Sequence, residues 1–226
     1  MKCEIKYAPQ NLDEVIYPSV AVERRIKGYA KQGINGHVML HGPNGTGKTT
    51  LGKLLINAIG GSDPFIENLE FEDLLAKSDL REFFSHSANI ARLSTSGKYF
   101  LLLNEFDNAK KNLNKFWTAL DACGDDVMAI ITTNYPMNID KSIRSRFDMI
   151  EMTAVTPIAA LPRIQFILQS EGLSLPDKQV LEYLKGKEHL GDLRKYFKIA
   201  DELLYLHSEN LSFQPWSGST PTLKVV

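Results

Sequence analysis

Residues 42–49 have the sequence GPNGTGKT, which matches the pattern G-x-x-x-x-G-K-[ST] in full. Glycines at 42, 45 and 47 permit backbone angles that point successive N–H groups at one anion. Lys48 would bring a mobile positive charge to the β and γ phosphates of a nucleotide, and the hydroxyl of Thr49 would be a ligand of Mg²⁺. We therefore expect this segment to bind nucleotide through Gly42, Pro43, Asn44, Gly45, Thr46, Gly47, Lys48, Thr49 and Thr50.

A second candidate segment, FLLLNEFD at 100–107, has an apolar run that leads directly into polar residues. In many nucleotide hydrolases the first polar residue here is an aspartate that holds magnesium, but this chain has Asn104. An amide oxygen can ligate Mg²⁺ or bond to a magnesium-bound water, although it carries no charge. Glu105 is placed to orient or deprotonate an attacking water. The pattern favours slow nucleotide hydrolysis over an inactive site.

The elements that must position these residues alternate between apolar strands and amphipathic helices. Strands are expected at 37–40, 98–103 and 127–131, with helices at 19–31, after the glycine loop and after residue 107. Such strands indicate a parallel sheet covered on both faces. We expect the 98–103 strand to lie beside the 37–40 strand, with its carboxyl end facing the γ-phosphate. Asn134 follows the 127–131 strand and could position the same water.

The alternation ends near residue 155, and three helical segments follow. The first begins either at Thr156 and Pro157 or only at Pro162. Residues 62–97 are expected to contain a strand near 64–69 and one or two helices. The sequence thus predicts an α/β domain at 1–154, a helical domain at 155–210, and a flexible or partner-bound tail at 211–226.

Composition excludes several classes of protein. Lys and Arg total 26 and Asp and Glu total 27, so net charge gives no general argument for nucleic-acid binding. No apolar run approaches the roughly 20 residues that span a bilayer, and the N-terminus has no apolar signal core. We therefore expect no membrane contact and a cytoplasmic location, or the host-cell cytoplasm for a viral protein. The histidines lack the spacing of metal-enzyme motifs.

Five segments together resemble the AAA+ ATPases, and within them the small ATPase subunits of clamp loaders, both replication factor C and phage loaders. These segments are EIKYAPQNLDEVIYPS, LHGPNGTGKTT, FLLLNEFDNAKKNLNKFWTALD, AIITTNYPMNIDKSIRSRF and GDLRKYF. The resemblance implies a P-loop NTPase domain followed by a small all-α lid. It does not extend to the helical collar domain with which such subunits continue.

The resemblance also implies roles for individual residues. Arg146 in SRF would be an arginine finger that acts in the site of a neighbouring subunit. Arg194 in GDLRKYF would touch the γ-phosphate of its own subunit; it lies off the apolar stripe of its helix, free to face outward. Ile16 would lie near the adenine. The expected catalytic set is completed by Lys48, Glu105 and Asn134.

The function implied is that of an ATP- and Mg²⁺-dependent subunit in DNA replication. It would assemble into a homo- or hetero-oligomeric AAA+ ring and act on a sliding clamp at primer–template DNA. A helicase loader, another DNA-remodelling ATPase and a hydrolysis-poor ATP-dependent scaffold remain alternatives. The sequence departs from the clamp-loader pattern at Asn104, at Ala8, where arginine is usual, and in the acidic 62–97 segment.

Overall fold

The computed structural model describes residues 2–33, 36–106, 113–185, 191–209 and 211 of the 226-residue chain. Residue Asp107 and residues 212–226 of the expected tail lie outside this part. The strands are β1 (His37–His41), β2 (Phe65–Glu70), β3 (Tyr99–Asn104), β4 (Val127–Thr133) and β5 (Phe147–Glu151). The helices are α1 (Cys3–Lys6), α2 (Val20–Gln32), α3 (Lys48–Gly60), α4 (Phe71–Leu75), α5 (Leu80–Ala91), α6 (Leu113–Asp121), α7 (Lys141–Arg144), α8 (Pro157–Ser170), α9 (Asp177–Lys185) and α10 (Leu193–Ser208). Short 3₁₀ turns lie at Leu12–Glu14, Gly124–Asp126 and Pro136–Asn138.

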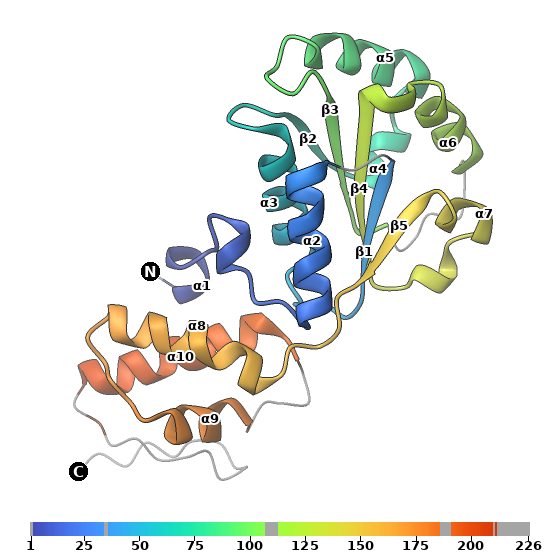
Figure 1. The fold of residues 1–226 in the computed structure, drawn as a ribbon. Coiled ribbons are helices and arrows are strands. Elements are labelled where there is room, and N and C mark those ends of the chain that lie inside the picture. The colour runs from blue at the N-terminus through green and yellow to red at the C-terminus, as the bar shows by residue number, and fades with distance from the viewer. Residues whose placement is uncertain (1, 34–35, 107–112, 186–190, 210, 212–226) are drawn as a thin grey trace.

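The five strands form one parallel sheet in the order β2-β3-β4-β1-β5, which confirms the expected α/β class (Figure 1). The expectation that the 98–103 strand lies beside the 37–40 strand is wrong, because β4 lies between β3 and β1. Every residue of β4 is buried, which suits a central strand. Apolar runs identify buried parallel strands, but they do not encode the order in which the strands pair.

Helices cover both faces of the sheet, as the continuous apolar strands require. On one face, α2 and α3 pack against the sheet through a cluster that includes Ile26, Leu51 and Leu55. On the other face, α4, α5, α6 and α7 pack through an aromatic-rich cluster that includes Phe84, Phe116 and Trp117. Figure 1 shows these two helical layers on opposite sides of the strands.

Strand β5 has no counterpart among the predicted strands. Its sequence FDMIE includes two carboxylates. Only its first and fourth residues are buried, because the strand lies at the edge of the sheet, where it pairs with β1. An edge strand buries less of its surface than a central one, so its apolar signal is weaker. Asp148 illustrates this, since its carboxylate forms an ion pair with Arg25 of α2.

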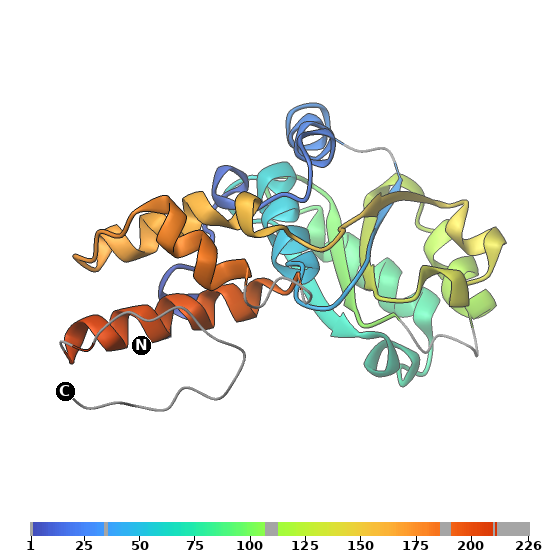
Figure 2. The same ribbon diagram turned by 90° about the horizontal axis from the view of Figure 1, so that it is seen from below.

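The three C-terminal helices α8, α9 and α10 form a separate layer beside the sheet domain (Figure 2). Helix α8 begins at Pro157, and the Thr156 hydroxyl caps it by accepting a hydrogen bond from the Ala159 N–H at 3.3 Å. Of the two predicted starts, the structure therefore has the earlier one. Pro162 lies inside the helix. In the described part of the chain no helix is both long and apolar enough to cross a membrane.

The N-terminal segment packs against these C-terminal helices. The Cys3 N–H donates to Asp201 Oδ1 of α10 at 2.8 Å, and the Cys3 side chain is buried among the helices of this layer. Lys6 and Tyr7 both bond to the carboxylate of Glu171. The boundary at 154 and 155 stays a prediction, but the first residues of the chain contribute to the core of the helical layer.

Candidate functional site

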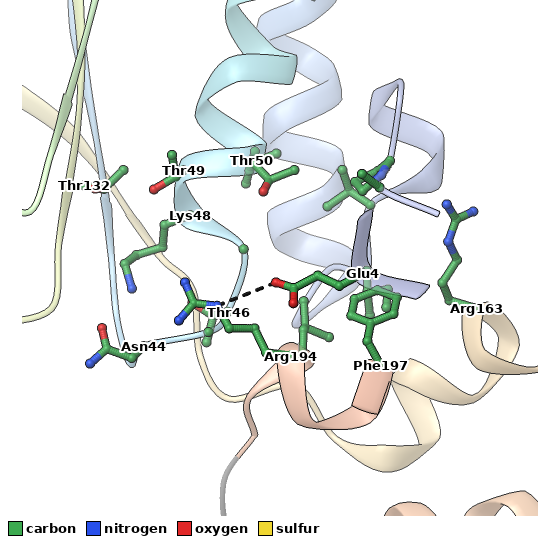
Figure 3. Close-up of a pocket in the computed structure, with 18 of the residues that line it drawn as sticks. Glu4, Asn44, Thr46, Lys48, Thr49, Thr50, Thr132, Arg163, Arg194 and Phe197 are labelled. Atoms are coloured by element: carbon green, nitrogen blue, oxygen red, sulfur yellow. Dashed lines mark ion pairs between the residues drawn. The ribbon is translucent and has the colours of Figure 1, made fainter. Parts of the chain in front are cut away.

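A cavity of about 470 Å³ lies where the glycine loop, the N-terminal segment and α10 meet. Most of the predicted nucleotide residues line it: Ile16, Asn44, Gly45, Thr46, Gly47, Lys48, Thr49, Thr50, Glu105, Asn134 and Arg194. Gly42, Pro43, Asn104 and Arg146 are not among the lining residues. Figure 3 shows Lys48 and Thr49 at the start of α3 on one side of this cavity and Arg194 and Phe197 of α10 on another.

The glycine loop has the backbone that its residue types predict. Gly42, Gly45 and Gly47 have φ values of 137°, 74° and 84°, in a region that residues with a Cβ rarely adopt. A Cβ at Gly42 would collide with the backbone of Met152, and one at Gly45 would collide with the Asp192 side chain. Gly47 is the N-cap of α3, so the first N–H groups of this helix, which have no acceptor within the helix, lie at the cavity.

Lys48 crosses the loop and connects it with β4. Its Nζ donates to the carbonyl oxygens of Gly42 at 2.9 Å and Pro43 at 2.7 Å, and to Asn134 Oδ1 at 2.9 Å. Asn134 reaches this lysine because β4, which it follows, is the direct neighbour of β1. The ammonium group is thus held in place over the loop by oxygen atoms that a phosphate could replace.

Two side-chain oxygens form a candidate magnesium site beside the loop. Thr49 Oγ1 lies 3.0 Å from Asn104 Oδ1, and Thr132 Oγ1 lies 3.5 Å from the same oxygen. Neighbouring oxygen ligands of an octahedral Mg²⁺ are about 3 Å apart, so the Thr49 and Asn104 oxygens fit this ion. Among the described residues no group of three or more His, Cys, Asp or Glu could hold a metal. A nucleotide-bound Mg²⁺ that keeps several waters requires no such group.

Glu105 has an unusual backbone conformation for a residue with a side chain. Its φ is 53°, and its N–H donates to Thr132 Oγ1 at 3.3 Å. The next N–H, that of Phe106, donates to the Thr132 carbonyl at 2.9 Å. The fully buried Phe106 ring packs 4.3 Å from that of Phe71, which holds the turn in place. The exposed Glu105 carboxylate is consequently presented to the cavity, and such local strain is common at functional sites.

The end of the cavity away from the loop is lined by Ile16, whose contact with the adenine stays a prediction, and by Arg163, which no motif indicated. Arg163 of α8 donates to the Tyr7 carbonyl at 2.9 Å and pairs with the Glu14 carboxylate at 3.2 Å. Its guanidinium also lies over the Phe166 ring. Arg163 therefore joins the helical layer to the N-terminal segment at this end of the cavity.

Arg194 lines the cavity near the loop, where its Nε lies 3.8 Å from the carboxylate of Glu4 (Figure 3). Both side chains are substantially exposed. The start of α10 also contacts the loop directly, because the Leu193 N–H donates to the Gly45 carbonyl at 2.9 Å. Glu4 was not among the predicted site residues, although it is the first residue of the EIKYAPQNLDEVIYPS segment; it stands in the four-residue helix α1.

Arg146 lies outside this cavity, between α7 and β5. Its Nη1 donates to the Ser142 carbonyl at 2.7 Å, and its Nε lies 3.4 Å from an Asp121 carboxylate oxygen. The side chain is 41% exposed. The structure thus separates Arg146 from the Lys48 site of its own chain, and its action in a neighbouring subunit stays a prediction.

Two histidines lie at opposite ends of β1. Burial lowers the pKa of both His37 and His41, so both are neutral at pH 7. The His37 Nδ1 accepts a hydrogen bond from the Ala129 N–H at 3.1 Å. Neither imidazole adds positive charge to the phosphate end of the cavity at this pH.

Comparison with known proteins finds relatives among replication proteins. The chain is 27% identical over 197 residues to replication factor C small subunit 2 of Pyrobaculum islandicum, a match covering 84% of this chain and 59% of that protein. It is 27% identical over 205 residues to the sliding-clamp-loader large subunit of Enterobacteria phage T4, covering 85% and 61%. The chain spans about three fifths of the length of these relatives. The predicted resemblance to clamp-loader subunits is thereby confirmed.

Solved structures share the fold at lower identity. A RuvB variant from Thermotoga maritima superposes with a TM-score of 0.67 at 16% identity, over 91% of this chain and 68% of that one. The FIGL-1 AAA domain gives 0.64 at 16% identity, over 90% and 74%. The family model described as "ATPase family associated with various cellular activities (AAA)" matches residues 38–154, more than half of the chain. The glycine loop, the parallel sheet and this match show that the chain belongs to the AAA family of ATPases.

Proposed function

We propose that this chain binds ATP with Mg²⁺ in the cavity beside the glycine loop and hydrolyses it there. One observation carries the proposal: at the start of α3, Lys48 bonds to Asn134 at 2.9 Å and the next residue, Thr49, bonds to Asn104 at 3.0 Å. They come from three parts of the sequence, and they converge at the carboxyl ends of β1, β3 and β4, the edge at which α/β sheets bind ligands.

Each side chain has a distinct part in this proposal. Lys48 and the loop N–H groups hold the β and γ phosphates, and the oxygens of Thr49 and Asn104 hold Mg²⁺. When bound, Mg²⁺ neutralises charge that develops on the phosphates. Glu105 orients the attacking water and accepts its proton. Asn134 shares the Lys48 ammonium with the γ-phosphate and so reports whether that phosphate is present.

The biological setting we propose is DNA replication, in an assembly that resembles a clamp loader. The names of the relatives, replication factor C small subunit and sliding-clamp-loader large subunit, support this setting. The partners would be other AAA+ subunits in a ring, a sliding clamp and primer–template DNA. Arg146 would complete the site of the adjacent subunit, which its partly exposed position outside its own cavity permits.

A Lys48→Ala variant tests nucleotide binding. Removing the ammonium group should abolish measurable ATP binding, because the phosphates lose their charge-assisted partner. Lys53→Ala is a matched control, since Lys53 is exposed on the same helix and does not line the cavity. Calorimetric titration with ATP and Mg²⁺ would measure both. Equal ATP affinity in the Lys48→Ala variant and the wild type would contradict the proposed site.

The role of Arg146 requires a mixing experiment. Arg146→Ala should retain ATP binding but lose turnover in the assembly. A Glu105→Gln variant should also bind ATP without turnover. Mixed assemblies of the two should recover part of the activity, since some sites then contain an intact Glu105 beside a neighbour with an intact Arg146. Lys141→Ala, an exposed change on α7, is the control. Absence of recovery would contradict action between subunits.

A second candidate function is an ATP-dependent scaffold with little hydrolysis. The neutral Asn104 favours it, because this amide brings no charge to the metal. Turnover measured with primed DNA and a clamp, with single-stranded DNA, and without DNA separates the possibilities. Stimulation by primed DNA and a clamp supports the clamp-loader function. Tight ATP binding with no turnover under any of these conditions supports the scaffold.

A further inference from the structure

The amide of Asn104 has two chemically different ends, and the structure gives each a different partner. Its Oδ1 faces the hydroxyls of Thr49 at 3.0 Å and Thr132 at 3.5 Å. Its Nδ2 donates to Oδ1 of Asn68, on the adjacent strand β2, at 2.6 Å. In this orientation the amide oxygen, which can ligate a metal, lies on the side of the proposed magnesium site.

The strand register explains why these two asparagines meet. In the pairing of β2 with β3, Asn68 lies opposite Leu102, and Glu70 lies opposite Asn104. Paired residues of neighbouring strands point to the same face of a sheet, so Asn68 is a diagonal neighbour of Asn104 on one face. Asn68 is exposed, whereas Asn104 is half-buried. Substitution of Asn68 therefore leaves the core intact.

The two hydroxyls cannot select the orientation of the Asn104 amide. A threonine hydroxyl can donate to an oxygen or accept from an NH₂ group, so Thr49 and Thr132 bond equally well to either end. A rotated amide would point its NH₂ group at the metal, and an NH₂ group has no lone pair available for Mg²⁺. A partner that accepts from Nδ2 favours the orientation that binds the metal.

We propose that Asn68 is a positioning residue that holds the Asn104 amide with its oxygen toward Thr49 and the magnesium position. This inference rests on the proposed function, since it assumes that ATP binds with Mg²⁺ beside Thr49. The chemistry also explains why an asparagine needs such a partner at this position. Both oxygens of an aspartate accept, so a carboxylate would present an oxygen to the metal in either orientation.

The test measures ATP affinity in excess Mg²⁺ and in EDTA. The ratio of the two affinities is the magnesium contribution. Asn68→Ala should reduce the magnesium contribution by up to about twofold, because an amide without a preferred orientation presents its oxygen to the metal in about half of the molecules. Affinity in EDTA should not change. Asn57→Ala is the matched control, because Asn57 is exposed on α3, about two helical turns beyond Thr49. This control should match the wild type under both conditions.

A charge test separates positioning from a general effect of the surface. Asn68→Asp keeps the acceptor and should retain the magnesium contribution. In an Asn104→Asp background the same substitution should reduce it, because an aspartate at 104 cannot donate to the carboxylate introduced by Asn68→Asp and the two like charges would repel each other. The positioning role of Asn68 would be wrong, and the proposed function unaffected, in either of two cases. One is an unchanged magnesium contribution in Asn68→Ala, and the other is an equal effect of Asn68→Asp with asparagine and with aspartate at position 104. Failure of the wild type to bind ATP in either buffer would overturn the proposed function as well.

Discussion

Replacement of Asn104 by aspartate should convert a weak magnesium site into a stronger one. The two side chains have nearly the same size, and the affected oxygen lies 3.0 Å from Thr49 Oγ1. Two unit charges about 4 Å apart in water interact by about 1 kcal/mol, so a carboxylate and a divalent ion gain about 2 kcal/mol. Screening as strong as that of water is the conservative choice for a half-buried side chain. This energy corresponds to about a 30-fold increase in magnesium affinity.

The substitution has one structural cost, which is small. Asn104 donates to Asn68 at 2.6 Å, and an aspartate cannot donate. Because Asn68 is exposed, its own amide can rotate and donate to the new carboxylate. The expected gain in magnesium affinity is therefore largely retained.

The assay is steady-state ATP hydrolysis as a function of Mg²⁺ concentration. For Asn104→Asp we expect the half-saturating Mg²⁺ concentration to fall by about 30-fold and turnover at saturating Mg²⁺ to rise. Asn57→Asp adds the same charge elsewhere on the same domain and should change neither quantity. If half-saturation stays the same, or if turnover falls in Asn104→Asp, then Asn104 does not face the metal and the proposed magnesium site is wrong.

Three further predictions concern the cavity and its support. Glu4→Gln should strengthen ATP binding by up to about fivefold, because an exposed ion pair of up to about 1 kcal/mol no longer competes with the γ-phosphate for Arg194. ADP, which lacks this phosphate, should gain less. Weaker ATP binding in a nucleotide titration would contradict this. Phe106→Ala should lower the free energy of unfolding by about 3–5 kcal/mol in urea denaturation, because the substitution leaves a cavity at a fully buried aromatic position. A loss below about 1 kcal/mol would contradict the supporting role of Phe106. Burial lowers the pKa of His37, so the unfolded chain binds the proton more readily and stability should fall as pH drops below about 6.5. Urea denaturation at pH 7.5 and 5.5 should show a smaller loss in His37→Gln than in the wild type, and an equal loss in both would contradict this cause.

The phosphate end of the site could be predicted from the sequence because its chemistry is local. The positive φ values, the lysine and the threonine all stand within eight consecutive residues, 42–49, and the structure places them as their types require. The other end of the cavity is formed by residues far apart in the chain. Arg163 reaches it through packing of the helical layer against the N-terminal segment, and no motif in the sequence contains this residue. Asn68 likewise meets Asn104 only through strand register.

The fold shows the same division between local and non-local information. Helix α2 could be predicted closely, because the Ser19 cap and the Gly33 end are encoded beside it. Strand β5 and helix α1 could not. The first is a partly exposed edge strand, and the second has only four residues and depends on contacts such as Cys3 with Asp201. The insertion of β4 between β1 and β3 is a property of the chain crossovers rather than of any strand's composition.

The hydrogen bond from Leu193 to Gly45 has a mechanical consequence. It links the turn that would surround the phosphates to the first residue of α10, a helix of 16 residues that is about 24 Å long. Asp192 also lies close to this turn, because a Cβ added at Gly45 would collide with its carboxylate. A rotation of α10 by a few degrees about this hydrogen bond would displace the C-terminal end of the helix by about an ångström or more. Occupancy of the phosphate turn would thereby be converted into a tilt of the whole C-terminal helical layer.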